Sequence, residues 1–402
     1  MTLRLRDRRD WEGRGGRAGS TEMATVVVAY AAFVLIGVSG GVTGVLLPAQ
    51  IRDYGVDQAT IGIAFFTGSA GFLLASTGSG ALLHRYGTRT ALVLGGAGFA
   101  VAGLCTAARP PLAVYLALQV LSGYGAGILE SVLSAHLATL PRVTARMNRL
   151  HAFFGVGALA GPALATWILR FARWPAVWLV LGLAAVPLTL GFWIVHPGPG
   201  TVGAEPAPVR RPRLLSQALR RPGVLFGATL LAAYVGVELS LGNWGYSYLI
   251  ERRGMSDAVA GYVVSGYWLG LTLGRFLLSP LANRIGLTAA GLMASCLTGV
   301  VAVTALTWLL PGAGTAAGCF AVLGFLLGPI FPTTMGAVPG LAPPHLVPTA
   351  IGIMNAGSVL GGSVLPWLAG TLAQGAGIAT LLPYTLALAV IQLTIWWRMA
   401  ES

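Results

Sequence analysis

The sequence contains no lysine at all and few charged residues of any kind. All 25 basic residues are arginine, and charged residues make up 9% of the 402-residue chain. A soluble domain carries about a quarter charged residues, so this chain has too little charge to cover a water-facing surface. Without lysine it also lacks the G-x-x-x-x-G-K-[ST] loop that cradles phosphates, which argues against ATP-driven transport by this chain.

The three cysteines form neither a disulfide pattern nor a metal-binding motif. Cys105, Cys296 and Cys319 stand far apart inside apolar segments, with neither the density of a disulfide framework nor the spacing of a zinc site. No Ser/His/Asp set and no metal-ligand cluster has convincing spacing either. The sequence therefore predicts a protein that is not an enzyme and that holds no cofactor and no metal.

Apolar residues dominate what is present. They make up 55% of the chain, and its 57 glycines suit the close backbone approach of helices in a membrane. A bilayer core needs about 20 apolar residues per helix. The first long run follows a basic tail, but it is too long for a signal peptide and lacks an A-x-A-like cleavage site, so we interpret it as a retained span. The pattern predicts an all-α membrane protein with twelve transmembrane helices: Met23–Leu47, Thr60–Leu83, Thr90–Ala108, Leu112–Ala138, Leu150–Leu169, Trp174–Val195, Val224–Ile250, Ala258–Leu281, Leu287–Leu310, Thr315–Val338, Thr349–Leu372 and Ile378–Trp397.

The placement of arginine predicts the orientation. With the N-terminus in the cytoplasm, eighteen arginines lie inside, six lie outside, and Arg275 lies within a run. We therefore expect a multi-pass protein of the cell membrane with both termini cytoplasmic. The net charge of +13 sits mainly in the gaps between apolar runs, which favours the lipid bilayer, and not nucleic acid, as the partner. We expect the chain to be a monomer.

The two halves of the chain repeat one another. HRYG at 84–87 matches NRIG at 283–286 with an offset of 199, and the Gly157/Gly161 pair matches Gly357/Gly361 with an offset of 200. Six helices per half keep both halves in the same orientation, which is the parallel-repeat plan of one large transporter class. The expected organisation is a cytoplasmic basic tail (1–22), an N-terminal six-helix bundle (23–195), a cytoplasmic linker (196–221) and a C-terminal six-helix bundle with a short tail (222–402).

The loop after the second run resembles a family signature. GALLHRYGTR at 80–89 is similar to the G-x-x-x-D-R-x-G-R-[RK] motif of the major facilitator superfamily, and the likeness covers Met23–Trp397. His84 replaces the aspartate and Thr88 the first arginine of the closing pair. The resemblance implies two six-helix bundles that rock about a central cavity. A cytoplasmic gating role would fall on Gly80, His84, Arg85, Gly87 and Arg89, with Asn283 and Arg284 at the matching loop of the second half; the alternative is a positively charged anchor and no more.

Within that superfamily, the closer likeness is to the fucose-permease-like sugar transporters. It is carried by GILES at 127–131, YVGVELSLGNWGYSYLI at 234–250 and WLGLTLGRFLLSPLANRIG at 268–286. Gly44 stands where that group has an aspartate in its first helix, so a scheme with two carboxylates is not available in its family form. Gly157, Gly161 and Pro162 also match part of an antiporter motif. We expect these residues, with Gly357 and Gly361, to serve helix packing, and the glycine-rich runs that contain them to form the sliding interface between the bundles.

Three ionisable residues lie well inside apolar runs. Each of Glu130, Glu238 and Arg275 costs about 2.5–3.5 kcal/mol at a helix centre, so such residues usually face a cavity or a partner. Glu130, in the GILES stretch, is expected to be the proton-coupling group; the alternative is a structural carboxylate. Arg275 is expected to pair with Glu238, its neighbour by helix, or with Glu130, which matches it in depth; otherwise it caps backbone carbonyls or extends to the interface.

Aromatic and amide side chains near these charges suit a polyol. Aromatic faces stack on sugar C–H groups, and amides bind hydroxyls. The candidates for the substrate cavity are Tyr234, Asn243, Trp244, His151 and Asn355, against helix packing as the plainer role.

The sequence therefore predicts a secondary active transporter that moves a small neutral solute such as a sugar, coupled to protons. The alternative is a proton-driven exporter of drugs or metabolites. A membrane sensor that transports nothing is a third hypothesis.

Overall fold

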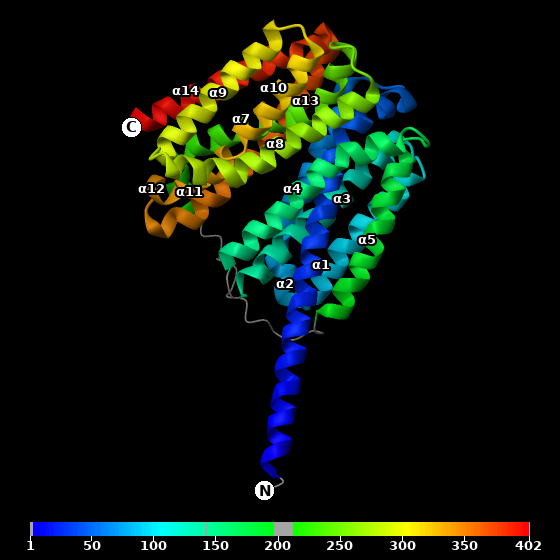
Figure 1. Ribbon diagram of the computed structural model, residues 1–402, viewed down its shortest axis with the longest axis vertical. Helices are drawn as coiled ribbons and strands as arrows, with labels where there is room; N and C mark the ends of the chain where they lie inside the picture. The colour runs from blue at the N-terminus through cyan, green and yellow to red at the C-terminus, as the bar shows by residue number, and fades with distance from the viewer. Residues whose placement is uncertain (1–2, 141–142, 197–211, 402) are drawn as a thin grey trace.

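The computed structural model describes residues 3–140, 143–196 and 212–401, and over these ranges its regular structure is entirely helical (Figure 1). The expectation of an all-α membrane protein is confirmed. The main helices are α1 (Leu3–Tyr54), α2 (Gln58–Ala107), α3 (Leu112–Ala138), α4 (Val143–Ile168), α5 (Pro175–Val195), α7 (Pro222–Glu251), α8 (Asp257–Arg284), α9 (Ala289–Leu309), α10 (Ala313–Leu327), α13 (Val347–Ala376) and α14 (Leu381–Glu401). Shorter ones are α6 (Pro212–Leu219), α11 (Ile330–Gly336), α12 (Val338–Leu341), η1 (Pro344–Leu346) and η2 (Ile378–Thr380).

These helices account for the twelve expected crossings. Ten helical segments of the described residues are long and apolar enough to cross a bilayer. One of them, α2, holds two of the expected runs, which Gly87 separates with non-helical dihedrals of φ 78° and ψ 168°. Helix α8, which contains Arg275, is 28 residues long and provides the remaining crossing. Helices α10 and α11 together form one crossing. A positive φ is accessible to glycine without a steric cost, so Gly87 permits the sharp turn between the two halves of α2.

The repeat extends to the ends of the helices. Gly55 and Gly254, 199 positions apart, both have φ +64° and end the first helix of their half. After each, a polar side chain caps the next helix: Asp57 accepts from the Thr60 amide, and Ser256 accepts from the Val259 amide. Gly87 and Gly286, again 199 apart, have φ of 78° and 73°. Four corresponding residues therefore adopt corresponding conformations, which strengthens the inference of duplication.

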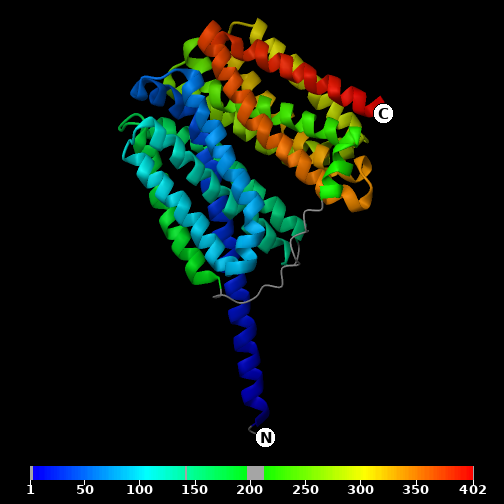
Figure 2. The same ribbon diagram turned by 180° about the vertical axis from the view of Figure 1, so that it is seen from behind.

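We call the end of the molecule that contains the turns at Gly87 and Gly286 the tail end. The opposite end, which contains the turns at 55–57 and 252–256, is the far end. One half consists of α1–α5 and the other of α6–α14. Figures 1 and 2 show that the halves lie against each other along α4 and α8 and along α2 and α13, whereas at the tail end α11 and α12 lie apart from α2 and α5. The linker residues 197–211 lie outside the described residues.

The predicted packing glycines lie between helices of the same half. A β-carbon at Gly157 would collide with the Val34 carbonyl of α1, and one at Gly361 with the Ala232 carbonyl of α7. Gly161 meets α1 in the same way, where Pro162 also packs against Gly41, and Gly357 meets Ala228 of α7. The contact between α4 and α8 is made instead at two other glycines, with Gly155 against Thr272 and Gly261 against Thr166. The contact between the halves therefore uses a different face of α4 from the one that contains the motif glycines.

Candidate functional site

A polar cluster lies between α7 and α8 in the second half. Arg275 donates from Nη2 to the Tyr234 hydroxyl at 3.4 Å and from Nε to the Gly328 carbonyl oxygen at 3.4 Å. Glu238 lies one turn after Tyr234 on α7, and its carboxylate and the Arg275 guanidinium attract each other. No ion pair within 4.0 Å joins the two among the described residues. Tyr234, which contacts both charges, bridges them.

The cluster is held in place by aromatic packing. Tyr267 of α8 donates its hydroxyl to the main-chain oxygen of Glu238 at 2.9 Å. The Tyr234 ring, which is fully buried, lies 6.1 Å from the Phe331 ring, centroid to centroid. Arg275 is thus oriented by α7, α8 and the break between α10 and α11. Of the two expected partners, Glu238 lies nearby, while no ion pair joins Arg275 to Glu130 among the described residues.

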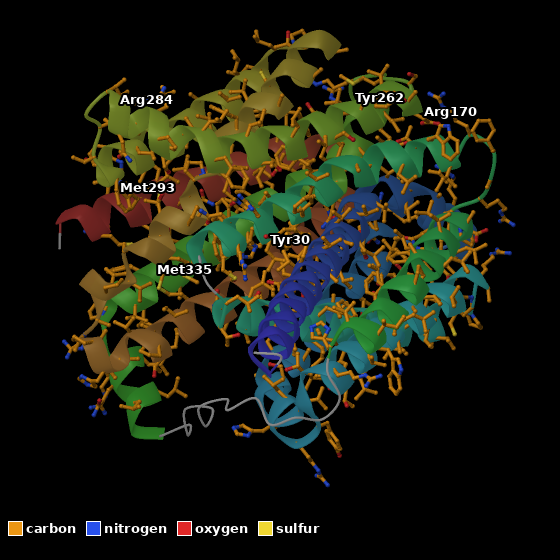
Figure 3. All side chains as sticks on the ribbon, turned by 60° about the horizontal axis from the view of Figure 1, so that its bottom comes forward. Tyr30, Arg170, Tyr262, Arg284, Met293 and Met335 are labelled. Carbon is orange, nitrogen blue, oxygen red and sulfur yellow. The ribbon has the colours of Figure 1, made fainter. Side chains whose placement is uncertain are left out.

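His151 lies across the interface from this cluster. The Arg275 guanidinium disfavours a positive charge on the His151 imidazole, and the contact of Gly155 with Thr272 one turn away brings α4 and α8 together. The His151 ring meets Phe33 of α1 edge-on at 5.9 Å. Nearby, Tyr30 of α1, labelled in Figure 3, stacks on Phe153 of α4 at 4.8 Å. Of these side chains, His151 is the one placed toward the charged cluster, since Phe153, like Gly157, lies on the face of α4 that packs on α1.

Glu130 stands apart from that cluster. It lies on α3, half-buried, between the buried Leu129 and the buried Val132 and Leu133. Over the part of the chain that the structure describes, the Glu130 carboxylate has no hydrogen bond and no ion pair. Among the described residues, no partner offsets the cost of a charge on this carboxylate in a membrane helix.

The remaining cavity candidates lie in different places. Trp244 is buried and donates from Nε1 to the Pro366 carbonyl oxygen at 2.8 Å. Asn243 is also buried, and its backbone touches Gly44 of α1. Asn355, by contrast, is exposed on α13. The structure brings Tyr234, Glu238, Arg275 and His151 together, but it places Asn243 and Trp244 in the far-end contact between the halves.

The predicted gating motif occupies the tail-end turn of α2. Gly80 is half-buried, and His84 and Arg85 are exposed beside the break at Gly87. Arg89 lies over the Trp193 ring of α5 at 3.9 Å. A cation over an indole face is attracted to it, so Arg89 ties the second part of α2 to α5. The matching Asn283 and Arg284 are exposed at the end of α8.

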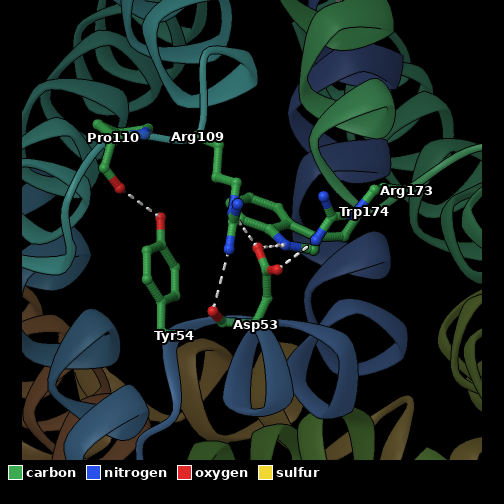
Figure 4. A network of polar contacts seen from close by, with 6 residues as sticks. All are labelled: Asp53, Tyr54, Arg109, Pro110, Arg173 and Trp174. Atoms are coloured by element: carbon green, nitrogen blue, oxygen red, sulfur yellow. Dashed lines mark hydrogen bonds and ion pairs between the residues drawn. The ribbon is translucent and has the colours of Figure 1, made fainter.

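Sequence reasoning missed the residues that organise the far end. Asp53, with a side chain only 8% exposed, binds Arg109 and Arg173 at 2.5 Å each and accepts from Trp174 Nε1 at 2.9 Å (Figure 4). It thereby ties the end of α1 to the turns before α3 and α5. The only sequence signal was an acidic residue at a helix end with arginines at later helix ends.

The two halves also meet at the far end. Gln374 of α13 donates to Asp57 and accepts from the Ala59 amide, and Trp367 Nε1 donates to the Ala59 carbonyl oxygen at 3.1 Å. A cavity of about 500 Å³ lies between the halves, with Arg52 and Arg170 on one side and Glu251 and Asp257 on the other. The halves are therefore in close contact at this end.

Comparison with known proteins agrees with this architecture. The sequence pattern of the Major Facilitator Superfamily matches residues 29–366 and again residues 243–402. The chain belongs to the Major Facilitator Superfamily. It is accordingly a multi-pass membrane protein that transports a small molecule and is not an enzyme.

Individual relatives are distant. The glucose/mannose transporter GlcP of Bacillus subtilis is 22% identical over 86% of this chain and 87% of its own. A probable multidrug-efflux transporter of Mycobacterium tuberculosis is 29% identical over 60% of this chain and 50% of its own. The crystal structure of a mutant of the nucleoside transporter NupG superposes with a TM-score of 0.78 at 12% identity, covering 94% of this chain and 99% of that one. This last likeness shows the fold, and the closer similarity to fucose permeases stays a prediction.

Proposed function

We propose that this protein is a proton-coupled transporter of a small neutral solute such as a sugar, with Glu130 as the proton-coupling group. The observation that carries the proposal is the isolation of Glu130, which has no partner among the described residues, whereas Glu238 is bound into a cluster with Tyr234 and Arg275. Arg275 offsets part of the cost of a charge on Glu238, whereas no described residue does so for Glu130. Glu130 is therefore the better candidate for the proton carrier.

The proposed cycle places the tail end in the cytoplasm, following the arginine count, and the protein in the cell membrane. Glu130 takes up a proton when its helix faces the outer water and releases it when the cavity opens inward. One charge moved through 100 mV is worth about 2.3 kcal/mol, and each pH unit adds about 1.4 kcal/mol. These energies suffice to accumulate a neutral solute, which itself carries no charge to drive it.

The substrate would bind between the charged cluster of the second half and His151 of the first. The half-buried Glu238 and Arg275 offer a hydrogen-bond acceptor and donors, and the exposed His151 lies across from them, while the fully buried Tyr234 orients Arg275. These polar groups fit the hydroxyl groups of a polyol. The likeness to a glucose/mannose transporter supports the same class.

The second candidate is a proton-driven exporter of drugs or metabolites. The likeness to a multidrug-efflux transporter and the partial antiporter motif at Gly157, Gly161 and Pro162 favour it. Purified protein in vesicles separates the two. Sugar import predicts that labelled glucose or mannose enters faster when the outside is made acidic; export predicts no sugar flux and proton-driven movement of a cationic dye such as ethidium.

A further inference from the structure

The first turn of α2 and the last turns of α13 are joined by a pair of reciprocal hydrogen bonds. Gln374 donates from Nε2 to Asp57 Oδ2 at 2.9 Å, and its Oε1 accepts from the Ala59 amide at 3.3 Å. The other oxygen of Asp57, Oδ1, accepts from the Thr60 amide at 2.7 Å. Asp57 therefore uses one oxygen to cap its own helix and the other to hold the opposite half.

A second contact two turns away on α13 reinforces the pair. Trp367 lies seven residues before Gln374, on the same face of the helix, and donates to the Ala59 carbonyl oxygen at 3.1 Å. Its ring meets Phe66 edge-on at 5.5 Å, and Gly62 leaves the space that the ring fills. Helix α13 thus forms hydrogen bonds with the Ala59 amide, the Ala59 carbonyl oxygen and the capping residue Asp57 at the start of α2.

These contacts must break when the far end opens. The hydrogen bonds that Gln374 and Trp367 make with Asp57 and Ala59 join one half to the other, and all of them lie at the far end. A transporter that alternates by rocking one bundle against the other separates these residues once per cycle. Their strength therefore enters the balance between the two states.

We propose that Asp57 and Gln374 form a latch that holds the far end closed and thereby positions the two halves for release at the tail end. The proposal goes beyond the transport function above, because it holds whatever the solute and whatever the coupling ion. A charged acceptor makes a stronger hydrogen bond than a neutral one, and the hydrogen bonds from Thr60 and Gln374 hold the pKa of Asp57 below its usual range. The acceptor thus stays ionised at ordinary pH.

Substitutions can distinguish the hydrogen bond between Asp57 and Gln374 from the cap of α2, because the donor and the acceptor of that hydrogen bond can be exchanged. Gln374→Glu opposes two carboxylates and breaks the bond without touching the cap of α2. Asp57→Asn retains a good cap, since Asn and Asp are equivalent there, but sets an amide against an amide. In the double variant, the new amide at 57 can donate to the new carboxylate at 374, which also still accepts from the Ala59 amide.

The matched control is Ser256, which caps α8 at the position 199 residues after Asp57. Its hydroxyl accepts from the Val259 amide at 3.5 Å and makes no hydrogen bond to the other half among the residues described. Ser256→Ala therefore removes the equivalent cap and leaves the latch in place.

The experiment measures the distance between spin labels at the far end, in full-length protein in lipid nanodiscs. After replacement of the three native cysteines, labels are attached at Arg170→Cys and Arg252→Cys, one in each half. The latch predicts that Gln374→Glu raises the ratio of open to closed far ends by about three- to tenfold, as expected for loss of a partly exposed hydrogen bond to a charged group. Asp57→Asn should raise it less, and the double variant should return it close to the wild-type value.

Three results would overturn the latch. The first is an open fraction in Gln374→Glu equal to that of the wild type. The second is a double variant that is no closer to wild type than Gln374→Glu alone, and the third is a Ser256→Ala shift of the same size, because either of these would assign the effect to general loss of helix-end stability. None of these outcomes depends on sugar or proton transport, so the latch and the proposed function can fail separately.

Discussion

Asp53 and Arg253 each fasten the far end of their half, with opposite charges. Asp53 lies in the last turn of α1, and Arg253 lies just beyond the end of α7. Asp53 binds Arg109, which precedes α3, and Arg253 donates to the carbonyl oxygen of Leu310, which precedes α10, at 2.7 Å. The same corner is thus fastened by a carboxylate in one half and by a guanidinium in the other.

This joint should contribute measurably to the stability of the first half. Asp53→Asn removes the charge that Arg109 and Arg173 share, and we expect a loss of about 1–2 kcal/mol, since both arginines are partly exposed and screened by water. The measurement is thermal unfolding of purified protein in detergent, with Arg170→Ala as a control nearby. An unchanged midpoint for Asp53→Asn would show that the network is not needed.

Close packing at Gly361 should be intolerant of a single methyl group. A β-carbon there meets the backbone of α7 at Ala232, whereas one at Gly352 on the same helix α13 meets nothing within 4 Å. Overpacking of this kind costs about 1–3 kcal/mol. Thermal unfolding should therefore show a clear loss for Gly361→Ala and none for Gly352→Ala; equal midpoints for the two would contradict the packing described.

Stability at acid pH should depend on His196, just beyond the end of α5. Burial, and then the neighbouring His136 at 5.3 Å between ring centroids, lower the pKa of His196 from 6.5 to about 4. Between these values the unfolded chain binds a proton that the folded chain does not. The stability is therefore fully present above pH 6.5 and is lost as the pH falls toward 4.

The expected loss on going from neutral pH to about pH 5 is about 1–2 kcal/mol. Unfolding midpoints measured at both pH values should show this loss in the wild type and much less of it in His196→Leu. The exposed His345, also at the tail end, provides the control His345→Leu. If His196→Leu retains the full pH dependence, another group is responsible.

The sequence was sufficient for the membrane helices, because hydrocarbon imposes a length and a composition that can be counted. It also predicted the repeat, and the turns at Gly87 and Gly286 agree with it. It could not say which neighbour a helix face meets. Gly157 was therefore expected between the halves, although it packs on α1 of its own half.

Contacts that depend on how the two halves pack against each other also could not be predicted from the sequence. The bond between Asp57 and Gln374 joins residues 317 positions apart, and no local pattern marks it. The partner of Arg275 depends in the same way on rotation about the helix axis, because helix adjacency favours Glu238 whereas matching depth favours Glu130. The approach of Tyr234 to Arg275 follows from their facing positions on α7 and α8.

The most direct test of the account is proton-driven uptake by Glu130→Gln in reconstituted vesicles, with exchange of labelled sugar across the same vesicles measured in parallel. Glu251→Gln, at the exposed end of α7, controls for loss of a carboxylate as such. The account predicts that Glu130→Gln abolishes accumulation driven by a pH gradient while exchange continues. Accumulation that persists in Glu130→Gln at the wild-type rate would contradict it.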